Sequence, residues 1–483
     1  MNPASITRLD LVLATPEMFL LAATCVILLG DLFLRDRDRW ITFVLSLLTL
    51  AGVGWITAAT GFTERTVGWH GTYVADPLST LLKIVACGAV AVAFLYGHGY
   101  LQERRILKGE YYVLGLFALL GVMVLASANS LVTLYLGVEL LALSLYALVA
   151  FNRDSGVAAE AAIKYFVLGS IASGALLYGM SILYGVTGSL ELGVISNAAL
   201  QMPAGQIGLL FGLAFIVVGV AFKFGGVPFH TWVPDVYHGA PTPVTLFLAA
   251  APKLGSFALA FRLLAEGLGA VHATGWQDMI TMVAVLSIIV GNVVAIAQTN
   301  IKRMLAYSTI SHVGFILLGI LAGTSQGYAA ALYYTITYVI MSVGGFGMII
   351  LLSRKGFEAD SLEDFKGLNA RSPWFAAVML MLMFSMAGVP PFVGFWAKLA
   401  VIQAVLDIGS LWLAILAVAL SVVGAYYYLR VVKLMYFDEP TDKAALQGGG
   451  GAMRFVLSLN GLAVLALGLY PGLLLALCAR VIP

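Results

Sequence analysis

The sequence predicts an all-α polytopic membrane protein with about 14 transmembrane helices. Hydrophobic residues fill 61% of the 483 positions and charged residues only 10%, whereas charged residues make up roughly 25% of a typical soluble domain. Apolar windows of about 20 residues, the length that crosses a hydrocarbon core of about 30 Å, recur from one end of the chain to the other. This composition excludes a soluble globular protein.

The apolar windows define the expected spans. They cover residues 11–34, 40–60, 76–98, 111–127, 130–151, 158–185, 207–237, 243–265, 276–298, 303–322, 328–353, 373–407, 411–435 and 453–478. The first window lacks the basic start and the small-residue cleavage site of a signal peptide, so we expect a retained helix. No segment between the windows is left for a soluble domain.

Basic residues are distributed unevenly between the predicted loops. Of the 26 Lys and Arg residues, 17 lie in loops on one side of the helices, four lie on the other side and five lie inside spans. Because Lys and Arg are enriched in cytoplasmic loops, the asymmetry supports the span assignment. It predicts a multi-pass protein with both termini facing away from the cytoplasm, which in a bacterial inner membrane is the periplasmic side.

The sequence offers no site for a cofactor or metal. Cys25, Cys87 and Cys478 stand alone in apolar spans without CxxC spacing, which argues against a metal, a cluster or a disulfide framework. The sequence contains neither a glycine-rich dinucleotide fingerprint nor a basic patch with interleaved aromatics. We therefore expect no bound cofactor, no redox centre and no nucleic-acid partner.

The ionisable residues inside spans are the candidates for function, because such groups are costly in a bilayer. Lys253 lies ten residues into its span, too deep for its ammonium to reach the interface, and Glu139 is central and alone in its span. Lys223 directly precedes a predicted helix break. We interpret these three as functional, and the alternative is a static buried ion pair. Lys83, near its helix start, fits a structural lysine that snorkels to the interface.

Two further residues leave both interpretations open. Lys164 has Glu160 four residues earlier on the same helix face, which fits either a surface pair or a half-buried proton relay. His312 lies mid-span among hydroxyl side chains, where an imidazole can pass on a proton. A neutral histidine hydrogen-bonded across a helix interface would look the same.

The spans 207–237 and 373–407 are too long for one straight crossing, and each has proline near its middle. Similar interruptions run from Gly226 to Phe229 and from Gly388 to Phe392. Proline frees a backbone carbonyl, which is tolerated at membrane depth only where protein or water satisfies it. We expect broken helices there, around a hydrated interior.

The broken spans are the seventh and the twelfth, as expected if spans four to eight and nine to thirteen form two inverted five-helix repeats. The predicted organisation is therefore N-terminal helices at 1–110, a first repeat at 111–265, a second repeat at 276–435 and a C-terminal helix at 453–483. Each repeat offers one titratable residue on its second helix, Glu139 or His312. Each also has a lysine beside its break, Lys223 or Lys398.

Three stretches carry a family resemblance that covers almost the whole chain. They are KFGGVPFHTWVPDVYHGAPTPVT from Lys223, NIKRMLAYSTISHVG from Asn300 and GVPPFVGFWAK from Gly388. Through them the chain resembles the antiporter-like membrane subunits of respiratory complex I. Lys398, where the subunit M type carries glutamate, and the absence of a long C-terminal lateral helix typical of the L type favour the subunit N type.

The resemblance implies two half-channels joined by a hydrated polar axis, with Glu139 paired to Lys223. It assigns proton transfer to Glu139, Lys164, Lys223, His230, Lys253, His312 and Lys398. It also implies that NADH, FMN, iron–sulfur clusters and quinone bind in partner subunits, among them neighbouring antiporter-like and small transmembrane subunits. The expected function is proton translocation coupled to NADH oxidation and quinone reduction.

Two alternatives remain open at this point. A subunit of a cation/proton antiporter or of a membrane-bound hydrogenase complex would share the fold and several motifs. A purely structural subunit would hold its charges in static pairs. In the proton-transfer interpretation, the charged ends of Glu139 and Lys223 should approach within ion-pair or water-bridged range.

The distribution of basic residues gives a topological prediction. A tag inserted near Arg354 should be accessible from the cytoplasm, and a tag after Arg480 should be accessible only from the opposite face. Protease or labelling accessibility in intact and opened vesicles measures this. Accessibility of both tags from one side would contradict the span assignment.

Overall fold

A computed structural model describes residues 6–202, 206–269, 275–440 and 448–482. The helices are α1 (Arg8–Leu13), α2 (Thr15–Asp31), α3 (Trp40–Ala59), α4 (Pro77–Glu103), α5 (Glu110–Ala126), α6 (Leu131–Val149), α7 (Gly156–Thr187), α8 (Leu192–Leu200), α9 (Ile207–Phe224), α10 (Trp232–Gly239), α11 (Thr242–Ala249), α12 (Ala251–Ala260), α13 (Trp276–Ile296), α14 (Ile301–Leu321), α15 (Ser325–Leu352), α16 (Leu368–Arg371), α17 (Pro373–Ala387), α18 (Val393–Asp407), α19 (Leu411–Phe437), α20 (Gly451–Leu469) and α21 (Pro471–Val481). In this described part of the chain, 11 helices are long and apolar enough to cross a membrane.

A few short elements connect the helices. They are the 3-10 helices η1 (Asp36–Asp38), η2 (Trp69–Gly71) and η5 (Leu362–Phe365), the π-helix η3 (Phe261–Glu266), and the strands β1 (Thr66–Gly68) and β2 (Tyr73–Ala75). The two strands pair antiparallel, with Val67 opposite Val74. This small sheet lies in the connection between α3 and α4.

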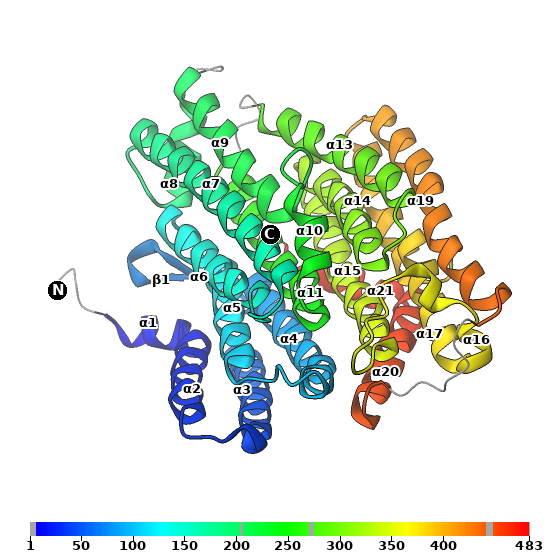
Figure 1. Ribbon diagram of the computed structural model, residues 1–483. Coiled ribbons are helices and arrows are strands. Elements are labelled where there is room, and N and C mark those ends of the chain that lie inside the picture. Colours follow the sequence, from blue (N-terminus) through cyan, green and yellow to red (C-terminus); the bar gives the residue numbers. More distant parts are fainter. Residues whose placement is uncertain (1–5, 203–205, 270–274, 441–447, 483) are drawn as a thin grey trace.

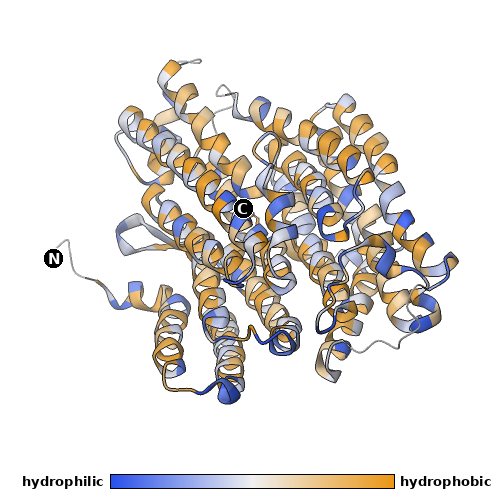
Figure 2. Ribbon diagram, in the orientation of Figure 1, coloured by the Kyte–Doolittle hydropathy of each residue, from blue (hydrophilic) through white to orange (hydrophobic). Residues whose placement is uncertain are grey.

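The helices form a bundle with the N-terminal helices α1 to α3 at one end and α16, α17 and α19 at the other (Figure 1). The segment from α11 to η3 is 100% buried over its apolar window and α14 and α15 are each 94% buried, whereas α19 is 33% and α20 is 28% buried. Figure 2 shows apolar colour along most helices and strongly hydrophilic colour at the turn between α2 and α3. The interior of the bundle is therefore built around α11, α12, α14 and α15.

Both predicted helix breaks are confirmed. Helix α9 ends at Phe224 and α10 begins at Trp232, while α17 ends at Ala387 and α18 begins at Val393. Each first half ends in a left-handed glycine, Gly225 with φ +77° and Gly388 with φ +88°, a conformation that suits glycine because it has no Cβ. The prolines that follow have no backbone N–H with which to continue the helix.

The span predicted over 243–265 is found as an apolar segment from Thr242 to Glu266, but it is not one regular helix. The chain leaves the helical conformation at Ala250, with φ −107° and ψ −94°, between α11 and α12. Pro252 explains the break, because a proline inside a helix loses a hydrogen bond and clashes with the preceding turn. Lys253 is consequently the third residue of α12 and not the middle of a long helix.

The windows at the two ends of the chain are also divided. The window 11–34 is split at Ala14 between α1 and α2, and the window 453–478 is split at Tyr470 between α20 and α21. In each case a proline lies in the first turn of the following helix, Pro16 as the second residue of α2 and Pro471 as the first residue of α21, where its missing N–H breaks no helical hydrogen bond.

A buried guanidinium joins the N-terminal helices to the interior. Arg262, 1% exposed, lies in η3 and donates to Asp76 at 2.8 Å, to Glu266 at 2.7 Å and to the carbonyl of Ala126 at 2.9 Å. Asp76 is the N-cap of α4. Burial acts to raise the pKa of the Asp76 carboxyl, but Arg262 and the backbone N–H of Ser79 outweigh burial and hold that pKa below its usual value.

Removing this guanidinium should destabilise the chain. We expect Arg262→Met to lower stability by about 3–5 kcal/mol, because two carboxylates lose their buried partner. The part contributed by Asp76 is present at neutral pH and is lost as the pH falls through the lowered pKa. The melting temperature of the solubilised complex measures the effect, with exposed Lys355→Ala as the control. Equal melting temperatures for the two variants would contradict the stabilising role of Arg262.

Candidate functional site

Lys253 caps the first broken helix. Its side chain is 1% exposed, and its Nζ donates to the carbonyl of Phe224, the last residue of α9, at 2.7 Å. The last carbonyls of a helix have no partner within the helix and carry the negative end of its dipole. The ammonium therefore lies where a cation is stabilised without a carboxylate.

Lys398 caps the C-terminal end of the first half of the second broken helix. It lies on α18, and its Nζ donates to the carbonyl of Ala387, the last residue of α17, at 2.9 Å. The Nζ atom is 5.3 Å from the centre of the Phe315 ring on α14. By their hydrogen bonds Lys253 and Lys398 are equivalent, whereas the sequence analysis had matched Lys398 with Lys223.

A third lysine with the same arrangement was missed. Lys302, on the first turn of α14, is 3% exposed and donates to the carbonyl of Ala240, the C-cap of α10, at 2.8 Å. From the sequence, Lys302 was expected in the loop before the span 303–322. Its position next to a helix start gave no sign that it would reach the end of another helix.

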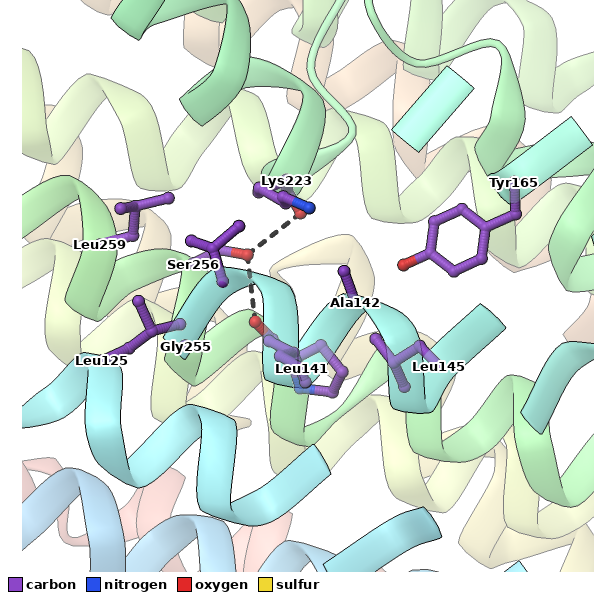
Figure 3. A pocket seen from close by; sticks show the side chains of 11 residues that line it. Leu125, Leu141, Ala142, Leu145, Tyr165, Lys223, Gly255, Ser256 and Leu259 are labelled. Atoms are coloured by element: carbon purple, nitrogen blue, oxygen red, sulfur yellow. Dashed lines mark hydrogen bonds between the residues drawn. The ribbon is translucent and has the colours of Figure 1, made fainter. Parts of the chain in front are cut away.

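Lys223 lies in the last turn of α9 beside a small cavity. Its Nζ donates to Ser173 on α7 at 3.3 Å, and its backbone carbonyl accepts from Ser256 on α12 at 3.0 Å. The cavity of about 20 Å³ is lined by Lys223, Ser256 and Tyr165, among others. Figure 3 shows the Tyr165 hydroxyl pointing into it. About 10–15 Å³ suffices for one water molecule, so the cavity can hold water between polar groups.

Glu139 lies at the edge of this region, and its carboxylate interacts with the hydroxyl of Tyr135 one turn earlier on α6. Its Oε1 atom is buried and has no hydrogen-bond partner among the described residues, although its charge acts electrostatically on Lys223. On α6 it shares a helix face with Val132, Leu136 and Leu143, which are 49%, 60% and 56% exposed. The carboxylate thus lies between the interior and an apolar outer face. In this structure no ion pair joins it to Lys223.

His312 is held by tyrosine hydroxyls. Its Nδ1 lies 2.8 Å from the hydroxyl of Tyr334 on α15, and its Nε2 lies 3.0 Å from the hydroxyl of Tyr428 on α19. Tyr428 also lies 2.5 Å from Ser308. The charge of Lys398 acts on the ring as well. The hydroxyl side chains beside His312 were evident in the sequence, but the two tyrosine partners were not predicted, although each lies in a run of tyrosines on its helix.

Lys164 and His230 make no hydrogen bond or ion pair with the buried lysines in the described part of the chain. Lys164, with a side chain 44% exposed, pairs with Glu160 and with Asp235, each at 2.9 Å, and Asp235 also pairs with Arg303 on α14 at 2.9 Å. This is an exposed charge cluster that links α7, α10 and α14. His230 is half-buried in the connection between α9 and α10, and no hydrogen bond joins it to the other candidates in the described ranges.

The expectation that Lys83 snorkels is wrong. Lys83 is 3% exposed, and its Nζ lies 2.7 Å from Glu17 on α2 and donates to Tyr73 at 3.0 Å. The ammonium remains at depth because α2 and β2 supply a carboxylate and a hydroxyl there. The sequence did not reveal this pair, since Glu17 belongs to a different helix.

Comparison with known proteins identifies the family. The family described as "NADH:quinone oxidoreductase/Mrp antiporter, TM" matches residues 128–424. Subunit N of NADH-quinone oxidoreductase from Thioalkalivibrio sulfidiphilus is 60% identical over 98% of this chain and 98% of its own length. The subunit N from Alkalilimnicola ehrlichii is 56% identical over 97% of this chain and 96% of its own.

Comparison with solved structures supports the same family assignment. A chain of respiratory complex I from Thermus thermophilus with bound aureothin superposes with a TM-score of 0.82 at 31% identity, covering 96% of this chain and 99% of that one. A chain of the Mrp complex from Dietzia superposes with a TM-score of 0.84 over 98% of this chain and 97% of its own, but at 22% identity this likeness concerns the fold alone. The chain therefore belongs to the antiporter-like membrane subunits of NADH-quinone oxidoreductase and is a proton-translocating subunit of the subunit N type.

Proposed function

We propose that protons cross this subunit through Glu139, Lys164, Lys223, His230, Lys253, His312 and Lys398, driven by NADH oxidation and quinone reduction in other subunits of complex I. The observation that carries the proposal is the pair of lysine caps. Lys253 and Lys398 each hold an ammonium at the end of a helix that stops inside the bundle.

Such a cap suits reversible protonation. A buried ammonium loses hydration, and the helix-end carbonyl returns part of that stabilisation. No carboxylate among the described residues pairs with either ammonium to fix its charge. A change of about 1.4 kcal/mol in the interaction with the surroundings then alters the ratio of protonated to neutral lysine tenfold.

The packing of the helices supports a contiguous route. Helix α12, with Lys253, contacts α9 and α15, and α14, with His312, contacts α15 and α18. A proton would pass from Lys223, through the adjacent cavity, toward Lys253. It would continue along the hydroxyls around His312 to Lys398.

Glu139 would act as the switch at the start of this route. The exposed apolar face of α6 suits a neighbouring small or antiporter-like membrane subunit, and the carboxylate lies on that face. Movement of Glu139 toward Lys223 would hold a proton on the lysine, and movement toward the neighbouring subunit would release that proton.

The proposal also includes the finer layout of the chain. It has 14 transmembrane helices, inverted repeats at 111–265 and 276–435, both termini on the periplasmic side, and no cofactor bound in this chain.

The lysine caps give the first functional prediction. Lys253→Gln should assemble, because an amide can still donate to the Phe224 carbonyl, yet it should pump fewer protons per electron because it cannot be protonated. Lys253→Arg should also pump poorly, since arginine does not release its proton. NADH-driven proton uptake by inverted vesicles, measured beside NADH:quinone activity, tests this. Exposed Lys355→Gln is the control. A normal number of protons pumped per electron in an assembled Lys253→Gln enzyme would refute the proposed role of Lys253 in proton transfer.

Glu139 gives the second functional prediction. Glu139→Gln keeps the shape and removes the charge that acts on Lys223, so pumping should fall, on the order of tenfold for a change of 1.4 kcal/mol. Exposed Glu64→Gln serves as the matched control. The same vesicle assay measures both variants. Equal pumping by the two would remove Glu139 from the mechanism.

A further inference from the structure

A large pocket opens on the side of the chain that carries most basic loops. Its volume is about 700 Å³, and it lies between α2, α5, the end of α6 and the loop that follows α6. Its walls are mainly apolar and include Leu28, Leu114, Phe117 and Ala147. None of the residues assigned to proton transfer lines it. This pocket is therefore separate from the site described above.

Basic side chains surround the mouth of this pocket. Arg105, Lys108 and Arg153 are exposed and line it, and none of their side chains has an ion pair or hydrogen bond among the described residues. The lining also contains two acidic residues, Asp154 and Glu110, and Glu110 lies 3.8 Å from Arg39, which pairs with Asp31 and Asp36 as well. Three cations therefore face two carboxylates, and the lining carries an excess of positive charge.

We propose that this pocket binds an anionic phospholipid of the adjoining leaflet. The headgroup phosphate would lie among Arg105, Lys108 and Arg153, and an acyl chain would lie against Leu28, Leu114 and Phe117. Basic pockets between transmembrane helices suit such headgroups. A phosphate supplies the strong acceptors that unpaired guanidinium groups lack here.

The same charges argue against a protein occupant. An apolar helix of a neighbouring subunit seated on the pocket would bury three cations against two carboxylates, and an uncompensated positive charge is costly in a membrane. A phospholipid brings the counter-charge and the apolar chain in one molecule. The combination of charged mouth and apolar wall therefore favours a lipid.

The test uses the intact complex in lipid nanodiscs with photoreactive lipids. Phosphatidylglycerol and phosphatidylcholine, each with a diazirine on one acyl chain, are compared by mass spectrometry of the labelled peptides. We expect the anionic probe to label α2 and α5 several-fold more than the zwitterionic probe. Equal labelling by the two probes would overturn the proposal, as would crosslinks from these helices to another subunit in place of lipid.

Charge variants give the second arm. Arg105→Gln, Lys108→Gln and Arg153→Gln should each reduce anionic labelling about fivefold, since each basic group near the surface contributes about that factor. Unchanged labelling in the triple variant would overturn the proposal.

The control variant carries Lys355→Gln, Lys366→Gln and Lys433→Gln, which remove the same charge from the same side of the chain away from the pocket. Labelling of the pocket by the anionic probe should stay at the wild-type level in this variant. An equal loss in control and pocket variants would show only a general effect of charge and would overturn the proposal.

A third arm leaves every charge in place. Leu114→Trp fills the apolar wall, so it should reduce labelling of α5 by the anionic probe even if the triple charge variant does not assemble. Wild-type labelling in Leu114→Trp would overturn the proposal.

Discussion

A helix that stops inside a membrane leaves carbonyl oxygens with no water to satisfy them, and the rest of this structure depends on how that need is met. In hydrocarbon every backbone polar group must find an internal partner. Here the partner at the ends of α9 and α17 is a lysine ammonium. The break and the buried charge therefore stabilise each other. Neither would be tolerated alone at this depth.

Local chemistry explains what the sequence could predict. Proline and glycine act on their own backbone, so the interruptions after Phe224 and Ala387 were visible in the order of residues. The same rule applies to Pro252, so the break at Ala250 could have been predicted from the sequence but was not.

Partners distant in the sequence explain what could not be predicted. Lys253 and Phe224 are 29 positions apart, Lys302 and Ala240 are 62 apart, and His312 and Tyr428 are 116 apart. Residue type indicated that each lysine needed a partner, but only packing decides whether that partner is a carboxylate, a hydroxyl or a carbonyl. Lys83 illustrates this, since its carboxylate comes from another helix.

For the proposed proton route, the two tyrosine hydroxyls on the His312 ring have a consequence for the direction of transport. Each hydroxyl can donate or accept, and each ring nitrogen can do either according to the tautomer. A proton that enters from one side leaves the hydrogen bonds pointing the opposite way, so every donor must rotate back before the next transfer. In the proposed route such a hydrogen-bonded chain could carry protons in either direction. The groups at its two ends would then have to impose the direction of transport, and an opposing electrochemical gradient could drive protons along the same chain in reverse.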